Sequence, residues 1–282
     1  TVGAYDMTLP EVNIGSIENR GFELTVGHKN TIGDLKYSMD FNISFIKNKI
    51  IDLATESLLN GGVHVVSPIT LTREGGAVSE YYGYKTNGLF RETDPMIAKV
   101  KGTKTTYIMA NQTFFIKANG DTAYFQPIAQ PGDVRYVDVN GDGIMDNKDK
   151  VSLGSPLPKF TFGFMVNLEY KMFDLNAFFN GSYGNKVFNG TKQYLYYAQG
   201  YGNRAAAFAN RYKNEVVKDG VVVVHANKDT DIPRFNSDNY AKPSDFYVED
   251  GSYIRLRSIQ LGFTVPKSIT QKMGIGRFKV YV

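Results

Sequence analysis

The feature that most constrains the fold is a stretch of alternating side chains at residues 35–45. Every second residue from Leu35 to Phe45 is apolar, and each residue between them is Lys, Ser, Asp or Asn. Because successive side chains of a β-strand point to opposite faces, this pattern predicts a strand with one apolar and one polar face. A mean strand in a globular protein has about 5–6 residues, whereas a tilted strand that crosses a bilayer needs about 9–11. The length favours a membrane-spanning strand, and a long strand of a soluble β-sandwich is the alternative.

Similar alternation occurs elsewhere in the chain. Residues 160–170 and 173–183 repeat the pattern, with Met165 as an exception on the polar face. Pairs of such segments joined by short connections are typical of β-hairpins. The predicted hairpins are 21–45, 160–183 with a turn near Lys171 and Met172, and 253–282, and weaker strand candidates lie at 81–90 and 106–117.

The apolar pattern changes phase within residues 253–265. Ile254 and Leu256 share one parity, whereas the apolar residues from Ile259 onward share the other. One extra residue in a strand shifts every following side chain to the opposite face. We therefore predict a β-bulge near Arg257 and Ser258.

The connections between these strands are of two kinds. Short turns alternate with long segments, which are 46–80, 91–105, 118–159 and 184–252. Short turns at one end and long loops at the other are typical of outer-membrane barrels. We predict an all-β fold, an antiparallel transmembrane β-barrel segment with long extracellular loops. About eight strands are found, and the last one stops within its pattern, so we interpret the chain as part of a larger barrel such as the 22-stranded transporters.

Composition excludes several other classes of protein. A charged content of 21% with a mean hydropathy of −0.28 excludes an ordinary α-helical membrane protein. The absence of Cys excludes disulfides, thiolate metal sites and a Cys nucleophile. The net charge of +4, without a Lys/Arg-rich run, gives no footprint for nucleic acid. No nucleophile elbow, P-loop, zinc-protease or dinucleotide motif is present, so we predict no enzymatic activity.

The segment DVNGDGIMDNKD at residues 138–149 is the most specific chemical motif. Its spacing resembles a calcium loop, with short oxygen side chains at positions 1, 3 and 5 and glycine at position 6. Asp stands at position 12, where Glu is usual, and prolines at 156 and 158 prevent a following helix. The alternative is an Asp/Asn/Gly turn cluster without an ion. The predicted Ca²⁺ ligands are Asp138, Asn140, Asp142, the carbonyl of Ile144, and Asp149.

Four tyrosines gather in the segment YLYYAQGY. Exposed tyrosines in an outer loop can contact a substrate or a protein partner. The alternatives are an aromatic belt at the membrane interface and packing beneath the loop. The predicted contact residues are Tyr194, Tyr196, Tyr197 and Tyr201.

Several of these segments together resemble one known family. They are SIENRGFELTVG (16–27), DVRYVDVNGDGIMDNKDKVSLGSPLPKFTFGF (133–164), FDLNAFFNGSYGNKVFN (173–189) and DGSYIRLRSIQLGFTVP (250–266). In this order they are similar to the C-terminal barrel of SusC/RagA-type TonB-dependent transporters, and they are distributed over most of the chain.

This resemblance implies nutrient uptake across the outer membrane of a Gram-negative bacterium. The family imports oligosaccharides or peptides together with a SusD-like surface lipoprotein, and TonB, ExbB and ExbD supply energy through an N-terminal region. We therefore expect residues 1–282 to be part of a barrel wall embedded in outer-membrane lipid, without the plug, the N-terminal strands and the final strands. Residues 133–159 are then an extracellular loop with the calcium-type motif, and the short turns face the periplasm.

A second class of function is also compatible with the sequence. The chain could be a surface β-domain that does not transport, such as an adhesin-like or carbohydrate-binding module stabilised by calcium. The long apolar faces separate the two interpretations, because a soluble module must cover them and a barrel leaves them against lipid.

Overall fold

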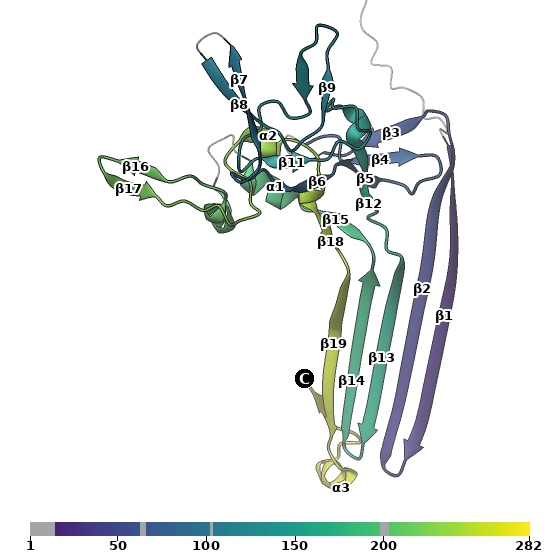
Figure 1. Cartoon of the computed structure of the whole chain (residues 1–282). Coiled ribbons are helices and arrows are strands. Elements are labelled where there is room, and N and C mark those ends of the chain that lie inside the picture. The colour runs from purple at the N-terminus through teal and green to yellow at the C-terminus, as the bar shows by residue number, and fades with distance from the viewer. Residues whose placement is uncertain (1–14, 63–65, 102–103, 198–202) are drawn as a thin grey trace, which may run out of the picture.

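The computed structural model describes residues 15–62, 66–101, 104–197 and 203–282 (Figure 1). One six-stranded antiparallel sheet, here called the wall, extends from one end of the molecule. A second region of short strands and helices, here called the head, caps the other end of the wall. The wall has the order β1 (Gly15–Ile32), β2 (Leu35–Leu53), β13 (Phe160–Tyr170), β14 (Phe173–Tyr183), β19 (Tyr253–Thr264) and β20 (Lys279–Tyr281).

The wall confirms the predicted all-β fold and the predicted hairpins. Strands β13 and β14 are joined by a tight turn at Lys171 and Met172, where Lys171 has φ of 53°. Strands β1 and β2 are longer than predicted, because the ladder continues through Asn30 and the turn is reduced to Gly33 and Asp34. Gly33 has φ of 59°, a conformation that glycine adopts without steric cost.

The register of the wall keeps apolar side chains opposite apolar side chains. Phe160 pairs with Phe45 of β2 and with Tyr183 of β14. At the other end of the same strand, Tyr170 pairs with Leu35 and Phe173. The apolar segments of three strands therefore lie at the same height, and a slip by one residue would turn each of them to the wrong face.

The predicted β-bulge is confirmed. Phe178 pairs with Ser258 and the next residue, Phe179, pairs with Leu256, so that Arg257 has no partner in the ladder. This extra residue returns Ile254 and Leu256 to the same face as Ile259.

The connection from β19 to β20 lies at the turn end of the wall. It contains α3 (Lys267–Thr270) and the 3₁₀ helix η4 (Gln271–Met273), followed by Gly274 with φ of 68°. Thr270 is buried and its carbonyl accepts a hydrogen bond from Ile275 N at 3.0 Å. The connection therefore has a defined fold of its own (Figure 1).

The head corrects the prediction that four long segments are plain loops. These segments contain short paired strands and a buried core. The predicted strand 81–90 is split at Lys85 into two strands, and the predicted strand 106–117 also contains two. The strands of the head are β3 (Ser57–Asn60), β4 (Thr70–Arg73), β5 (Glu80–Tyr84), β6 (Thr86–Leu89), β7 (Met96–Lys101), β8 (Lys104–Met109), β9 (Phe114–Ile116), β10 (Thr122–Tyr124), β11 (Val134–Tyr136), β12 (Lys150–Gly154), β15 (Lys186–Phe188), β16 (Val216–Lys218), β17 (Val221–Val224) and β18 (Val248–Asp250). Its helices are η1 (Asn147–Asp149), α1 (Gly190–Tyr196), η2 (Ala206–Asn210), α2 (Ser237–Tyr240) and η3 (Asp245–Tyr247).

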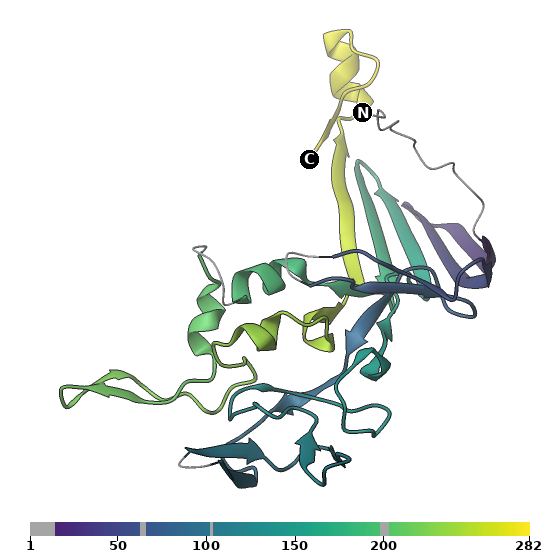
Figure 2. The ribbon, with the colours of Figure 1, turned by 90° about the horizontal axis from the view of Figure 1, so that it is seen from above.

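The buried apolar residues lie mostly in the head. One cluster joins Tyr84, Phe125 and Tyr212, and another joins Tyr196, Phe208 and Tyr240. Seen from above, the head extends to one side of the wall (Figure 2). In the part of the chain that the structure describes, no helix has the length and apolarity to span a membrane.

Candidate functional site

The first candidate site is the wall, whose two faces differ in chemistry. One face carries Leu35, Phe41 and Phe45 of β2, continued across the sheet by the apolar residues of β13, β14 and β19. These side chains stay exposed, as Ile259 at 60% and Phe173 at 50% show. On β1 and β2 this apolar face ends above Phe45, where Lys47 pairs with Arg20. The apolar face is therefore a band with a defined upper limit.

The opposite face of the wall is lined by amides, hydroxyls and a few charges. Asn167 Nδ2 donates to Ser38 Oγ at 3.0 Å across two strands. The charged residues at its turn end are paired, with Lys279 Nζ 2.9 Å from Asp174 Oδ2 and Lys36 Nζ 3.9 Å from Glu169 Oε2. The polar face thus suits contact with water, a polar ligand or a polar protein surface.

A buried ionic network fixes the head. The Asp133 carboxylate accepts hydrogen bonds from Arg234 Nε at 2.6 Å and from Asn239 Nδ2 at 2.9 Å. Asn239 Oδ1 in turn accepts from Val134 N at 3.0 Å. In addition, Thr86 Oγ1 donates to Asp245 Oδ1 at 2.6 Å. These contacts join segments that are more than a hundred residues apart in sequence, so they hold the outer connections as one body.

The second candidate site is the predicted calcium loop at residues 138–149. Asp138 accepts hydrogen bonds from Gly141 N at 2.7 Å and Gly143 N at 2.8 Å. Asn140 Oδ1 accepts from Asp142 N at 3.2 Å, and Asp142 Oδ1 accepts from Ile144 N at 2.8 Å. The side chains at positions 1, 3 and 5 therefore cap their own turn.

Positions 1 and 12 of this loop come together. Asp149 is fully buried and accepts hydrogen bonds from Val139 N at 3.1 Å and Asp146 N at 2.9 Å. Burial raises the pKa of Asp149, and the nearby charge of Asp138 raises it further. Burial also acts to raise the pKa of Asp138, but hydrogen bonds from Thr113, Gly143 and Gly141 outweigh it and lower the pKa. Two neighbouring carboxyl groups of this kind are an arrangement that a bound cation would stabilise.

The loop is also packed against the head. A Cβ at Gly143 would lie 2.5 Å from the carbonyl carbon of Phe114, and Gly143 has φ of 73°. Among the described residues, no group of three or more His, Cys, Asp and Glu side chains is arranged to hold a metal ion. The loop offers two acidic groups together with amide and carbonyl oxygens, and Ca²⁺ binding stays a prediction.

The predicted tyrosine contacts divide into three cases. Tyr196 and Tyr197 are 9% and 8% exposed and pack in the core of the head, as the alternative interpretation predicts. Tyr194 is 57% exposed, and its contact with a substrate or partner stays a prediction. Tyr201 lies outside the described residues.

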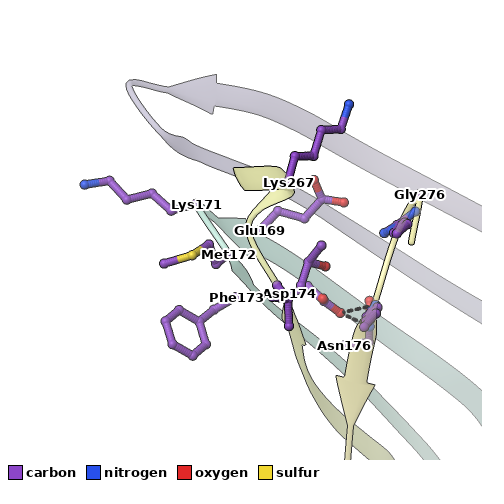
Figure 3. A pocket seen from close by; sticks show the side chains of 12 residues that line it. Glu169, Lys171, Met172, Phe173, Asp174, Asn176, Lys267 and Gly276 are labelled. Carbon is purple, nitrogen blue, oxygen red and sulfur yellow. Dashed lines mark hydrogen bonds and ion pairs between the residues drawn. The ribbon is translucent and has the colours of Figure 1, made fainter. Parts of the chain in front are cut away.

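The structure adds a cavity that sequence analysis did not identify. It has a volume of about 570 Å³ and lies at the turn end, between the β13–β14 turn and the β19–β20 connection (Figure 3). Polar residues of the wall line it, among them Glu169, Asp174 and Asn176, together with Lys267 and Arg277 of the connection. No pattern in the sequence brings these residues together, because the connection only meets the wall through the β19–β20 pairing.

Comparison with known proteins identifies relatives over nearly the whole chain. TonB-dependent receptor P3 of Formosa agariphila is 30% identical over 275 residues, which cover 96% of this chain and 24% of that protein. TonB-dependent receptor P26 of the same organism is 32% identical over 286 residues, covering 97% and 25%. TonB-dependent receptor SusC of Bacteroides thetaiotaomicron is 22% identical over 253 residues, covering 89% and 21%. The chain thus spans about a quarter of the length of these relatives.

Solved structures agree with these relatives. The structure of the RagAB peptide transporter matches with a TM-score of 0.64 and 18% identity, covering 95% of this chain and 25% of that one. The RagAB peptide importer in its closed-closed state matches with a TM-score of 0.60 and 19% identity. At this identity the match shows a common fold, and no family model matches the chain.

The two-faced wall, the sequence relatives and the shared fold agree with one another. The chain belongs to the SusC/RagA-type TonB-dependent receptors, and its all-β fold is a segment of their antiparallel β-barrel.

Proposed function

We propose that the chain forms part of the barrel wall and outer head of a transporter that imports nutrients across the outer membrane. The observation that carries this proposal is the apolar band of the wall. From Phe160 to Tyr170 a strand of ten steps at about 3.3 Å spans roughly 33 Å, or about 25 Å at a tilt of about 40°. This height equals the apolar band of roughly 25 Å in outer-membrane barrels. The neighbouring strands keep the same limits, because Phe45 and Tyr183 both pair with Phe160.

The chemistry of the two faces assigns their surroundings. The exposed apolar face contacts lipid, and the polar face lines the lumen. On the lipid face of β1, His28 is an exception near the turn end, where its Nε2 lies 3.1 Å from Tyr37 Oη. The turn end faces the periplasm and the head lies outside the cell, which places the chain in the outer membrane of a Gram-negative bacterium.

The partners of this transporter follow from its relatives. RagAB is named a peptide transporter, and SusC is named a TonB-dependent receptor. We propose that the complete receptor works with a SusD-like surface lipoprotein and is energised by TonB, ExbB and ExbD. Its cargo is an oligosaccharide or a peptide. The head carries the largest set of fixed outer side chains and is the surface that the lipoprotein meets.

The alternative of a surface β-domain that does not transport is disfavoured by the same band. A soluble module would have to cover Phe22 and Ile254, which are 61% and 70% exposed. No described segment of the chain lies over this face (Figures 1 and 2).

Uptake in living cells tests the proposal. Bacteria that carry the full-length receptor are compared with a deletion strain, using labelled oligosaccharide and peptide mixtures. We expect receptor-dependent uptake of one of the two mixtures, and its loss when a protonophore removes the proton gradient. Uptake that is equal in the deletion strain, or that is unaffected by the protonophore, would contradict the proposal.

We further propose that the 138–149 loop binds Ca²⁺, which stiffens the head. The support is that the carboxyl groups of Asp138 and Asp149 lie together although one of them is buried. In millimolar Ca²⁺ the loop of the full-length receptor should resist protease better than in EDTA, and the double variant D138N/D142N should lose this difference. The variant D219N, in the turn between β16 and β17, is the control and should keep it. Equal protection with and without Ca²⁺ would show that the cluster is a turn without an ion.

A further inference from the structure

The charge balance of the turn-end cavity is uneven. Each carboxylate that lines it already has a cationic partner, since Asp174 pairs with Lys279 at 2.9 Å and Glu169 with Lys36 at 3.9 Å. The lining cation Lys171 is paired with Asp34 at 3.6 Å. The remaining lining cations, Lys267 and Arg277, form no ion pair or side-chain hydrogen bond within the described ranges. The cavity therefore presents two positive charges that nothing on the wall compensates.

The fold holds these two cations at the rim. Both belong to the β19–β20 connection, whose ends are tied by the hydrogen bond from Val265 N to Phe278 O at 2.9 Å. The buried Thr270 and the bond to it from Ile275 fix the connection between them. Figure 3 shows Lys171 pointing away from the other lining side chains, so it does not share this rim.

The position of the cavity limits what can reach it. Asp174, Asn176 and Lys279 belong to the polar face, as their pairing with Gly262, Gln260 and Thr264 shows. The cavity thus opens to the polar side of the wall and away from the apolar band. If that side is the lumen, as the proposed function requires, lipid headgroups are excluded and a chain that passes through the lumen is admitted. A volume of about 570 Å³ is within the usual range for a ligand site and suits a few residues of an extended peptide.

We propose that this cavity binds a carboxylate-bearing polypeptide segment, with Lys267 and Arg277 as the cations that receive the carboxylate. A guanidinium can hold a carboxylate with two parallel hydrogen bonds, and an ammonium acts as a second point charge. Asn176 adds an amide that can bind the peptide backbone. The same chemistry has two sources, a segment of the complete receptor outside this chain or an imported acidic peptide.

Photo-crosslinking tests the site and separates the two sources. The full-length receptor, in its native membrane, carries benzoyl-phenylalanine at Asn176. It is irradiated with and without the biotinylated probe peptide Glu-Glu-Glu-Gly, and the products are identified by mass spectrometry. A product within the receptor itself, next to Asp or Glu, identifies an internal segment, and a product that carries biotin identifies a peptide ligand.

Charge variants decide whether the two cations are responsible. The pair K267Q/R277Q should reduce the crosslink about tenfold, the loss expected from two partly exposed charge contacts. The control K272Q removes an exposed cation of the same connection that does not line the cavity, and should leave the crosslink unchanged. No product in either arm, or a product indifferent to K267Q/R277Q, overturns the proposal. Because the readout is a crosslink, it is independent of uptake, so a failure of import and a failure of this site are told apart.

Discussion

The wall and the head of this molecule are stabilised in different ways. The wall buries little within the chain and repeats one rule, an apolar residue on one face and a polar residue on the other. The head buries whole side chains, with Tyr240 and Tyr247 fully inaccessible, and ties remote segments through Asp133. The difference teaches that the wall depends on its solvent and its register, whereas the head depends on its own core. Each of the following variants, made in the full-length receptor, breaks one of these regions and leaves the other.

The largest effect is expected from a change of register in the wall. Deleting Asn167, in the middle of β13, shifts half of the strand by one residue and turns its apolar side chains to the polar face. We expect no folded barrel, as judged by loss of the heat-resistant band on SDS gels. Deleting Arg257 is the control, because it removes only the extra residue of the bulge and keeps both faces in place. If both deletions have the same effect, the register shown by the wall is wrong.

The next effect concerns the core of the head. Tyr240→Ala removes a fully buried ring and the hydrogen bond from its Oη to Pro233 O at 2.6 Å. The loss should be about 3–5 kcal/mol of local stability. Hydrogen exchange should accelerate in the head and stay unchanged in β13 and β14. Tyr194→Ala, at a residue that is 57% exposed, should cost less than about 1 kcal/mol. Faster exchange throughout the wall would show that the two regions are one cooperative unit.

A charge on the apolar band gives a somewhat smaller effect. Ile259→Arg places a guanidinium at mid-height against lipid and should cost about 2–4 kcal/mol in urea unfolding from bilayers. Its neighbour Gln260 lies at the same height on the polar face, and Gln260→Arg should change stability by less than about 1 kcal/mol. Equal costs for the two variants would mean that both faces meet the same surroundings.

The smallest effect separates two glycines of the 138–149 loop. Both have positive φ, 75° at Gly141 and 73° at Gly143, so alanine at either position costs about 1–2 kcal/mol in backbone strain. Only Gly143 also lies against the backbone of Phe114 and Phe115. Gly143→Ala should therefore increase protease cleavage of the loop more than Gly141→Ala. The reverse order would show that the loop does not pack on β9.

The wall could be predicted from the sequence because its information is local. Alternation within 35–45 and 160–183 gives the strands and their faces, and the change of parity around Arg257 gives the bulge. The head could not be predicted, because its strands are three to six residues long and its core joins residues such as Val134 and Asn239 from distant segments. The turn-end cavity also depends on how β20 returns to β19. The spacing of the 138–149 motif did indicate that Asp138 and Asp149 meet, since a calcium loop brings positions 1 and 12 together.

Accessibility of single spin labels along β19 tests the central claim most directly. The chain has no Cys, so each label can be attached to one introduced residue of its wall. In bilayers, labels from 254 to 263 should alternate between contact with oxygen dissolved in lipid and contact with a water-soluble nickel complex, with one change of phase at Arg257. Ile259 and Gln260 should give opposite signals. Uniform access of the nickel complex to every position would contradict a wall with one face in lipid and one in the lumen.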